Sequence, residues 1–276
     1  MGKFDGILIC TDLDGTLYKN DKSISQENRD AIEYFEREGG AFTFITGRMP
    51  YYSMDAFRAA RPNVPFGCIN GGGVFDGLRE EYVFTLELPK GALELVGYID
   101  EKFPEVGVQL CGFDKTYFAK ENCTTARHRE ITGIPNYTCD YKSFSEPLGK
   151  IMFCTDIEEE IQAVERALRS HPLASEYDFI RSERSLFEIL PKGTHKGVAL
   201  CKLAEFLKID MKKTVAIGDY DNDAMMLREA GCGIAVSNAS RAALSAADVV
   251  TVSNEEHAIA RIISDIELGR LKEYMG

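Results

Sequence analysis

Asp12 and Asp14 lie two residues apart in the segment Asp12–Thr16, directly after the apolar run Ile7–Thr11. In an extended chain, side chains at positions i and i+2 point the same way, with Cα atoms about 6–7 Å apart. Two carboxylates this close repel each other unless a cation lies between them or one of them is protonated. The pair therefore indicates either a Mg²⁺ site or a nucleophile beside a general acid; a solvated acidic turn is the alternative.

A second acidic segment, Gly218–Asp223, follows the apolar run Thr214–Ile217. Its alternating carboxylates match the first three ligand positions of a calcium EF-hand loop. The sixth and twelfth positions, Ala224 and Ala230, lack the Gly and Glu that such a loop needs. N-capping of the next helix by Asn222 or Asp221 is a further interpretation, but capping alone does not need so many carboxylates.

Two shorter segments carry groups that suit a phosphate. Thr46-Gly47-Arg48 follows the apolar run Ala41–Ile45, where a hydroxyl and a backbone N–H beside Gly47 could bind phosphate oxygens. Lys196 lies at the predicted start of a helix, a place where a lone lysine is usually a solvated charge. None of these segments decides the chemistry alone, but their order along the chain is informative.

The surrounding pattern predicts a doubly wound α/β fold. In the first and last thirds of the chain, short apolar runs alternate with helical patterns, as in a parallel sheet buried on both faces. The predicted strands are Ile7–Thr11, Ala41–Ile45, Phe66–Asn70, Thr214–Ile217, Gly233–Val236 and Val249–Val252. The carboxyl ends of such strands form the crevice in which ligands bind, so both acidic segments are expected there.

The middle of the chain differs. Two amphipathic helices, near Ala92–Phe103 and over Ile157–Leu168, lie among strand-like runs that include Tyr82–Leu86 and Leu186–Leu190. We therefore predict an inserted α+β domain over residues 83–187, within a discontinuous Rossmann-like core of residues 1–82 and 188–276. Asn70-Gly71-Gly72-Gly73 is interpreted as a flexible loop near the junction.

Composition limits the partners. The chain has 276 residues and a formal net charge of −12, which disfavours general binding to nucleic acid or to an anionic membrane. The eight cysteines are scattered, without a C-x-x-C pair, and are expected to be free thiols. With neither a signal-peptide pattern nor an apolar run of about 20 residues, the sequence favours a cytoplasmic location. It leaves the oligomeric state open.

The four motifs, in this order, resemble those of the haloacid dehalogenase superfamily, and the long insertion after the second motif resembles the cap of its Cof-type sugar-phosphate phosphatases. The motif residues are Asp12-x-Asp14-Gly15-Thr16, Thr46-Gly47-Arg48, Lys196 and Gly218-Asp219-x-x-Asn222-Asp223. The resemblance covers the whole chain. It implies a phosphatase that uses Mg²⁺ and acts on a small phosphorylated metabolite.

By this resemblance, Asp12 would be the nucleophile that forms an aspartyl-phosphate, and Asp14 the general acid and base. The metal would be held by Asp12, by the backbone carbonyl of Asp14 and by Asp219. The phosphoryl group would be bound by Thr46, Gly47, Lys196, Asn222 and the backbone N–H of Leu13. Asp223 would position Lys196 or a metal-bound water. The roles of Arg48 and His195 stay open, and cap side chains such as Tyr117, Lys120 and Arg127 are specificity candidates by location only.

Two other functions are compatible with these residues. A hexose phosphomutase shares such a core and cap, and would return the phosphoryl group to sugar rather than to water. A non-catalytic module, such as a receiver-like domain, would also gather carboxylates around an aspartate. Receiver domains are much shorter, however, and carry the phosphorylated aspartate on a later strand.

Overall fold

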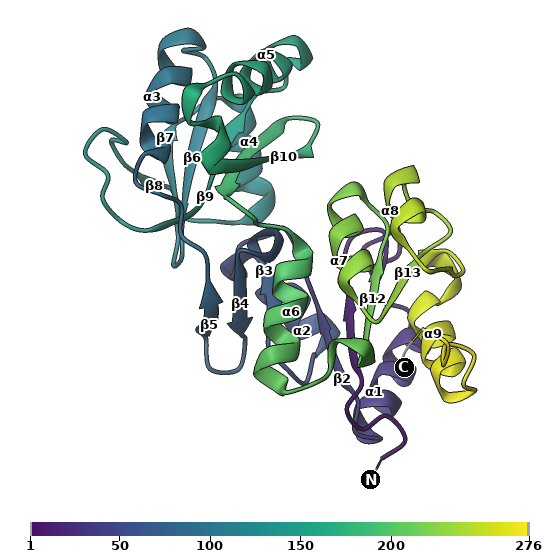
Figure 1. Cartoon of the computed structure of the whole chain (residues 1–276). Helices are drawn as coiled ribbons and strands as arrows, with labels where there is room; N and C mark the ends of the chain where they lie inside the picture. The colour runs from purple at the N-terminus through teal and green to yellow at the C-terminus, as the bar shows by residue number, and fades with distance from the viewer. Residues whose placement is uncertain (1, 275–276) are drawn as a thin grey trace. The chain divides into compact units, whose positions relative to one another are not determined.

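The structure is a computed structural model that describes residues 2–274 (Figure 1). The chain divides into two compact units, which we call the core, within Met1–Phe84 and His195–Gly276, and the cap, Thr85–Thr194. The second junction therefore differs from the expected one at residues 187/188. It lies after Leu186–Pro191 because this strand is paired on both sides within the sheet of the cap.

The core contains a five-stranded parallel sheet in the order β14-β13-β12-β1-β2. Its strands are β1 (Leu8–Thr11), β2 (Ala41–Phe44), β12 (Thr214–Gly218), β13 (Cys232–Ala235) and β14 (Val249–Val250). The helices of the core are α1 (Gln26–Arg37), α2 (Met54–Ala60), α6 (Lys196–Leu207), α7 (Ala224–Glu229), α8 (Arg241–Ala246) and α9 (Ala258–Glu267).

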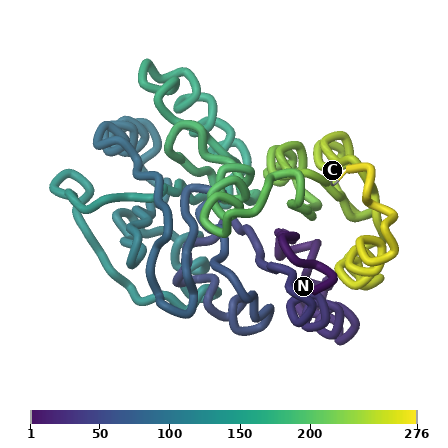
Figure 2. The backbone as a smooth tube through the Cα atoms, turned by 60° about the horizontal axis from the view of Figure 1, so that its bottom comes forward, coloured from purple at the N-terminus to yellow at the C-terminus, as the bar shows by residue number. Residues whose placement is uncertain are grey.

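Helices cover both faces of this sheet, because the chain leaves its centre in two directions. The connection from β1 through α1 to β2 runs one way, and the connections from β12 through α7 and α8 run the other. Since such crossovers are right-handed, the two groups of helices lie on opposite faces. One face packs Leu8 and Cys10 against α6, α7 and α8, and α9 lies beside α1 (Figure 2). The predicted doubly wound fold is confirmed.

The predicted strand Phe66–Asn70 and the predicted loop at Asn70–Gly73 are both partly wrong. A strand forms only over β3 (Phe66–Cys68), which pairs antiparallel with β4 (Gly73–Asp76) and begins a separate small sheet that ends with β5 (Glu81–Thr85). Ile69–Gly71 forms a 3₁₀ turn between β3 and β4. Asn70 is only 1% exposed, so this segment is an internal turn of the core rather than a surface loop.

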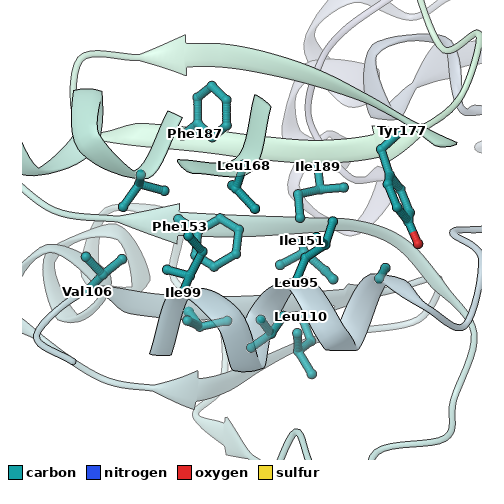
Figure 3. Close-up of a cluster of buried hydrophobic side chains, with 14 of the residues drawn as sticks. Leu95, Ile99, Val106, Leu110, Ile151, Phe153, Leu168, Tyr177, Phe187 and Ile189 are labelled. Atoms are coloured by element: carbon teal, nitrogen blue, oxygen red, sulfur yellow. The ribbon is translucent and has the colours of Figure 1, made fainter. Parts of the chain in front are cut away.

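The cap is built on a six-stranded sheet in the order β10-β11-β9-β6-β7-β8. Its strands are β6 (Gly107–Gly112), β7 (Thr116–Lys120), β8 (Tyr137–Thr138), β9 (Leu148–Cys154), β10 (Tyr177–Glu183) and β11 (Leu186–Pro191). Two amphipathic helices, α3 (Ala92–Lys102) and α5 (Glu158–Arg169), bury their apolar faces on one side of it. Figure 3 shows Leu95, Phe153 and Phe187 within this apolar cluster.

A third helix of the cap, α4 (Cys123–Thr132), was not predicted. Asn122 caps it by accepting a hydrogen bond from the N–H of Thr125 at 3.0 Å. His128 on this helix contacts Gln109, whose neighbours along β6 point into the apolar cluster, so α4 lies on the opposite face of the sheet. That face also buries an ion pair between Lys150 and Glu188, 2.9 Å apart.

All eight cysteines are free, and five of them are buried. Within residues 2–274, none of the helices has both the length and the apolar character that crossing a membrane requires.

Candidate active site

The two acidic segments meet at the carboxyl end of the core sheet. Strands β1 and β12 are hydrogen-bonded neighbours, with Thr11 opposite Ile217, and the N–H of Asp12 donates to the carbonyl of Ile217 at 2.8 Å. The chain departs in opposite directions from these two strands, and ligands of open α/β sheets bind at such a point. Carboxylate oxygens of Asp12, Asp219 and Asp223 lie within 4.8 Å of one another here.

Lys196 lies between two of these carboxylates. It is the first residue of α6 and is 1% exposed, and its Nζ is 2.5 Å from Oδ1 of Asp12 and 2.5 Å from Oδ1 of Asp223. Burial acts to lower the pKa of Lys196, but the two carboxylates outweigh it and raise the pKa. The ammonium group therefore stays charged and partly neutralises the acidic cluster.

Asp12 is itself only 8% exposed. Burial raises the pKa of Asp12 to about 7; the charge of Lys196 opposes the rise, while those of Asp223 and Asp219 add to it. A single lysine thus does not fully compensate the carboxylates. A bound cation would favour the ionised form of Asp12, which a nucleophile needs.

Asp219 approaches the first acidic segment closely. Its Oδ1 accepts a hydrogen bond of 2.7 Å from the hydroxyl of Thr16. Gly15 has a φ of +81°, and a Cβ built there would lie 2.5 Å from Oδ2 of Asp219, so only glycine fits this contact. Burial raises the pKa of Asp219 to about 6, with the hydrogen bond from Thr16 opposing the rise.

Asp223 is held by the backbone of its own segment. Its Oδ2 accepts hydrogen bonds from the N–H groups of Asp219 and Tyr220, both at 2.9 Å, and its Oδ1 binds Lys196. Oδ1 of Asp12 binds Lys196 and Oδ1 of Asp219 binds Thr16, so the Oδ2 atoms of these two residues are the candidate ligands for a cation. Two carboxylate oxygens, with backbone carbonyl and water, form a donor set that suits Mg²⁺.

The side chain of Asp14 points toward two cations outside the cluster. Its Oδ2 is 2.6 Å from a guanidinium nitrogen of Arg48, and its Oδ1 is 2.8 Å from Nζ of Lys22. Burial acts to raise the pKa of Asp14, but the bonds and charges of Lys22 and Arg48 lower it overall. In this conformation Asp14 is held as a carboxylate.

The predicted phosphate-binding residues lie around a second part of the site. Thr46 is 3% exposed and follows β2, and its N–H donates to the carbonyl of Gly67 at 3.0 Å. Asn222 lies in the 3₁₀ turn Asp221–Asp223, before α7, and reaches across to Asn70. Leu13, between the two aspartates, has a fully buried side chain, so only its backbone can take part.

Sequence reasoning missed three residues that touch this site. The sequence indicates Thr16 only as a member of a motif, yet its hydroxyl donates directly to Asp219. Lys22 forms an ion pair with Asp14, a pairing for which the sequence carries no signal. Asn70 is the last residue of a predicted strand and the first of a predicted loop, although an Asn-Gly pair at such a point signals a turn with positive φ.

Comparison with known proteins identifies the family. A profile of the haloacid dehalogenase-like hydrolases matches residues 9–263. The chain belongs to this family. One relative, the 5-amino-6-(5-phospho-D-ribitylamino)uracil phosphatase YitU of Bacillus subtilis (strain 168), is 29% identical, and the match covers 94% of this chain and 96% of that protein. The prediction of an enzyme, a phosphatase of this superfamily, is thereby confirmed.

Solved structures show the same fold. A haloacid dehalogenase-like hydrolase from Bacteroides thetaiotaomicron has a TM-score of 0.83 at 24% identity, over 94% of this chain and 99% of that chain. The subclass IIB sugar phosphatase BT4131 has a TM-score of 0.77 at 20% identity, over 94% of this chain and 98% of that chain. At these identities the likeness concerns the fold alone.

Proposed function

We propose that this haloacid dehalogenase-like phosphatase hydrolyses small phosphorylated metabolites with Mg²⁺, through a phosphorylated Asp12. One observation carries the proposal. Carboxylate oxygens from two segments distant in sequence, at Asp12 and Asp219, converge within 4.8 Å beside the buried Lys196. A solvated acidic turn, the simpler alternative, would not bury these groups together.

Asp12, Asp219 and the backbone carbonyl of Asp14 would hold the metal. When bound, Mg²⁺ supplies positive charge that offsets the carboxylates and the transferring phosphoryl group. The raised pKa values of Asp12 (about 7) and Asp219 (about 6), which burial causes, support this assignment, since both groups lack sufficient compensating charge. Lys196 would add a fixed cation next to the reacting oxygen of Asp12.

In the first step, a carboxylate oxygen of Asp12 forms a bond to phosphorus as the ester P–O bond breaks. The leaving alkoxide takes a proton from the carboxyl group of Asp14. Thr46, Gly47, Asn222, Lys196 and the backbone N–H of Leu13 bind the equatorial oxygens. Such positioning and charge compensation supply most of the catalysis of phosphoryl transfer.

In the second step, Asp14 removes a proton from water, the water oxygen attacks phosphorus, and the P–O bond to Asp12 breaks. Orthophosphate leaves and both carboxyl groups regain their starting protonation. To act as an acid, Asp14 must first leave Arg48 and Lys22, which stabilise its charged form in this structure. Arg48 thus belongs to the resting arrangement of Asp14.

For the substrate, we favour phosphorylated sugars and sugar alcohols. The name of YitU specifies a phosphorylated ribityl compound, and BT4131 is named a sugar phosphatase. The formal charge of −12 again disfavours nucleic acid and membrane surfaces as partners. We further propose that the enzyme acts in the cytoplasm, where its eight free cysteines would stay reduced.

The test is phosphate release from p-nitrophenyl phosphate and from a panel of phosphorylated sugars and nucleotides. We expect turnover with MgCl₂, loss of turnover with EDTA, and no turnover by the Asp12→Asn variant. Full activity of Asp12→Asn would exclude the covalent route. Product analysis with a hexose 1-phosphate distinguishes free phosphate from an isomerised sugar phosphate, which a phosphomutase would form.

A further inference from the structure

Asn70 is a buried polar residue in the middle of the proposed phosphoryl-binding groups. Its backbone N–H donates to the carbonyl of Thr46 at 3.1 Å, and its Oδ1 accepts from Nδ2 of Asn222 at 3.0 Å. A Cβ built on Gly47 would lie 2.9–3.2 Å from the three terminal atoms of the Asn70 side chain. Asn70 therefore contacts three residues that we assign to phosphate binding.

The turn that carries Asn70 has an unusual backbone. Ile69, Asn70 and Gly71 have successive φ values of +56°, +52° and +100°. A β-branched residue such as isoleucine rarely adopts positive φ, and conformations of this kind persist where the surrounding structure over-determines them. Here the surroundings include the start of α6, since a Cβ on Gly71 would lie 1.9 Å from the carbonyl oxygen of His195.

The turn is therefore packed against the residue next to Lys196. This contact relates the turn of Asn70 to the segment of Lys196 as well. The buried turn thus brings the amide of Asn70 to Gly47, after β2, and to Asn222, in the 3₁₀ turn before α7, while Gly71 packs against the start of α6.

The amide of Asn70 has an unused donor. Its Nδ2 is buried and has no hydrogen-bond partner among the described residues. Leaving a buried donor without a partner is unfavourable, so buried polar groups of folded proteins are almost always bonded. An orphan donor next to Gly47 and Asn222 points to an acceptor that is supplied by a ligand.

We propose that Asn70 is a phosphoryl-binding residue: its Oδ1 orients Asn222, and its Nδ2 donates to an oxygen of the bound phosphoryl group and of product orthophosphate. This inference rests on the proposed function. It adds to the four motifs a fifth segment that contacts the ligand. The alternative is that Asn70 only holds the turn and Asn222 in place.

Two variants separate these roles. Asn70→Gly removes the whole amide while tolerating positive φ, so the turn is kept. Asn70→Asp keeps an acceptor for Asn222 but replaces the donor with a negative charge. Asn63→Ala is the control, because Asn63 also bonds core backbone, to Phe42 and Gly40, both at 2.9 Å, away from the proposed ligand groups.

The measurement is the dissociation constant of orthophosphate in saturating MgCl₂, by calorimetry, with the KM for p-nitrophenyl phosphate and the melting temperature alongside. A hydrogen bond to a charged group predicts that Asn70→Gly weakens orthophosphate binding about tenfold or more. Asn70→Asp should weaken it further, because its carboxylate would face the anion. Asn63→Ala should lower the melting temperature and leave the dissociation constant unchanged.

Four outcomes would overturn the inference. Unchanged affinity in Asn70→Gly means that the amide does not contact the ligand. Tighter binding by Asn70→Asp than by Asn70→Gly means that only the contact with Asn222 matters. If wild type hydrolyses p-nitrophenyl phosphate and both variants match its KM and its dissociation constant for orthophosphate, this inference fails and the proposed function stands. If wild type neither hydrolyses p-nitrophenyl phosphate nor binds orthophosphate, both fail.

Discussion

The substitution Lys196→Met tests how charge is balanced in the site. It replaces a fully buried ammonium, 2.5 Å from both Asp12 and Asp223, with an apolar chain of similar length. Removing one partner of a buried ion pair costs about 3–5 kcal/mol, because the other charge stays buried. Burial already raises the pKa of Asp12 to about 7, so this group can take up a proton and relieve part of the cost.

We therefore expect a loss near the lower end, about 3 kcal/mol in metal-free buffer. For a unit of this size, that lowers the melting temperature by roughly 6–12 °C. MgCl₂ should restore more stability to Lys196→Met than to wild type, because the added cation has no lysine to compete with. Differential scanning calorimetry with and without MgCl₂ measures both effects.

Lys150→Met in the cap provides the matched control. Lys150 is also buried, 2.9 Å from Glu188, but it lies in a different unit from the Asp12 cluster. Its loss should be destabilising to a similar degree, without additional rescue by MgCl₂. Equal rescue of the two variants, or an unchanged melting temperature of Lys196→Met without metal, would refute this reasoning.

Three further predictions address the metal, the pH dependence and the cap. Asp219→Asn should raise the Mg²⁺ concentration needed for half-maximal hydrolysis. The increase should exceed the factor of about 10–100 that is typical when a residue behind a metal ligand is changed, because Asp219 itself would bind the metal. An unaltered Mg²⁺ titration would contradict this. Burial, helped by the charge of Lys150, lowers the pKa of His128 to about 4, so the stability present above pH 6.5 is lost as the pH falls toward 4. In urea unfolding, wild type should lose about 2 kcal/mol more than His128→Gln between pH 7 and 5, because the titration of the other groups is common to both proteins; identical pH profiles of the two proteins would exclude the effect. Phe153→Ala in the apolar cluster of the cap should cost about 3–5 kcal/mol in the same assay, and a loss below about 1 kcal/mol would count against its burial.

The site was predictable to the extent that its residues follow strands. Asp12 and Asp219 each come directly after an apolar run, and a parallel sheet brings the carboxyl ends of such strands to one edge. The sheet order itself then places β1 next to β12. Periodicity similarly indicated α3 and α5, whose apolar faces repeat at helical spacing.

Other features depend on contacts that local sequence does not encode. Asn70–Gly73 has the composition of an exposed loop, but contacts with distant segments bury it, such as those of Gly71 with the start of α6 and of Asn70 with Asn222. Helix α4 buries chiefly Thr124 and Thr125, so it lacks the apolar periodicity by which helices are recognised. The pairing of Lys150 with Glu188 spans 38 residues, and the sequence offers no signal for it.

The most direct test of the account is to locate the phosphorylated residue during turnover. The enzyme is mixed with substrate and MgCl₂, quenched in acid, reduced with borohydride and digested, and the peptides are analysed by mass spectrometry. We predict a single acyl-phosphate, converted by reduction to homoserine at position 12, and absent in Asp12→Asn. A modified Asp14 or Asp219, or no adduct in a preparation that releases the alcohol product with a pre-steady-state burst, would contradict the assignment of Asp12 as the nucleophile.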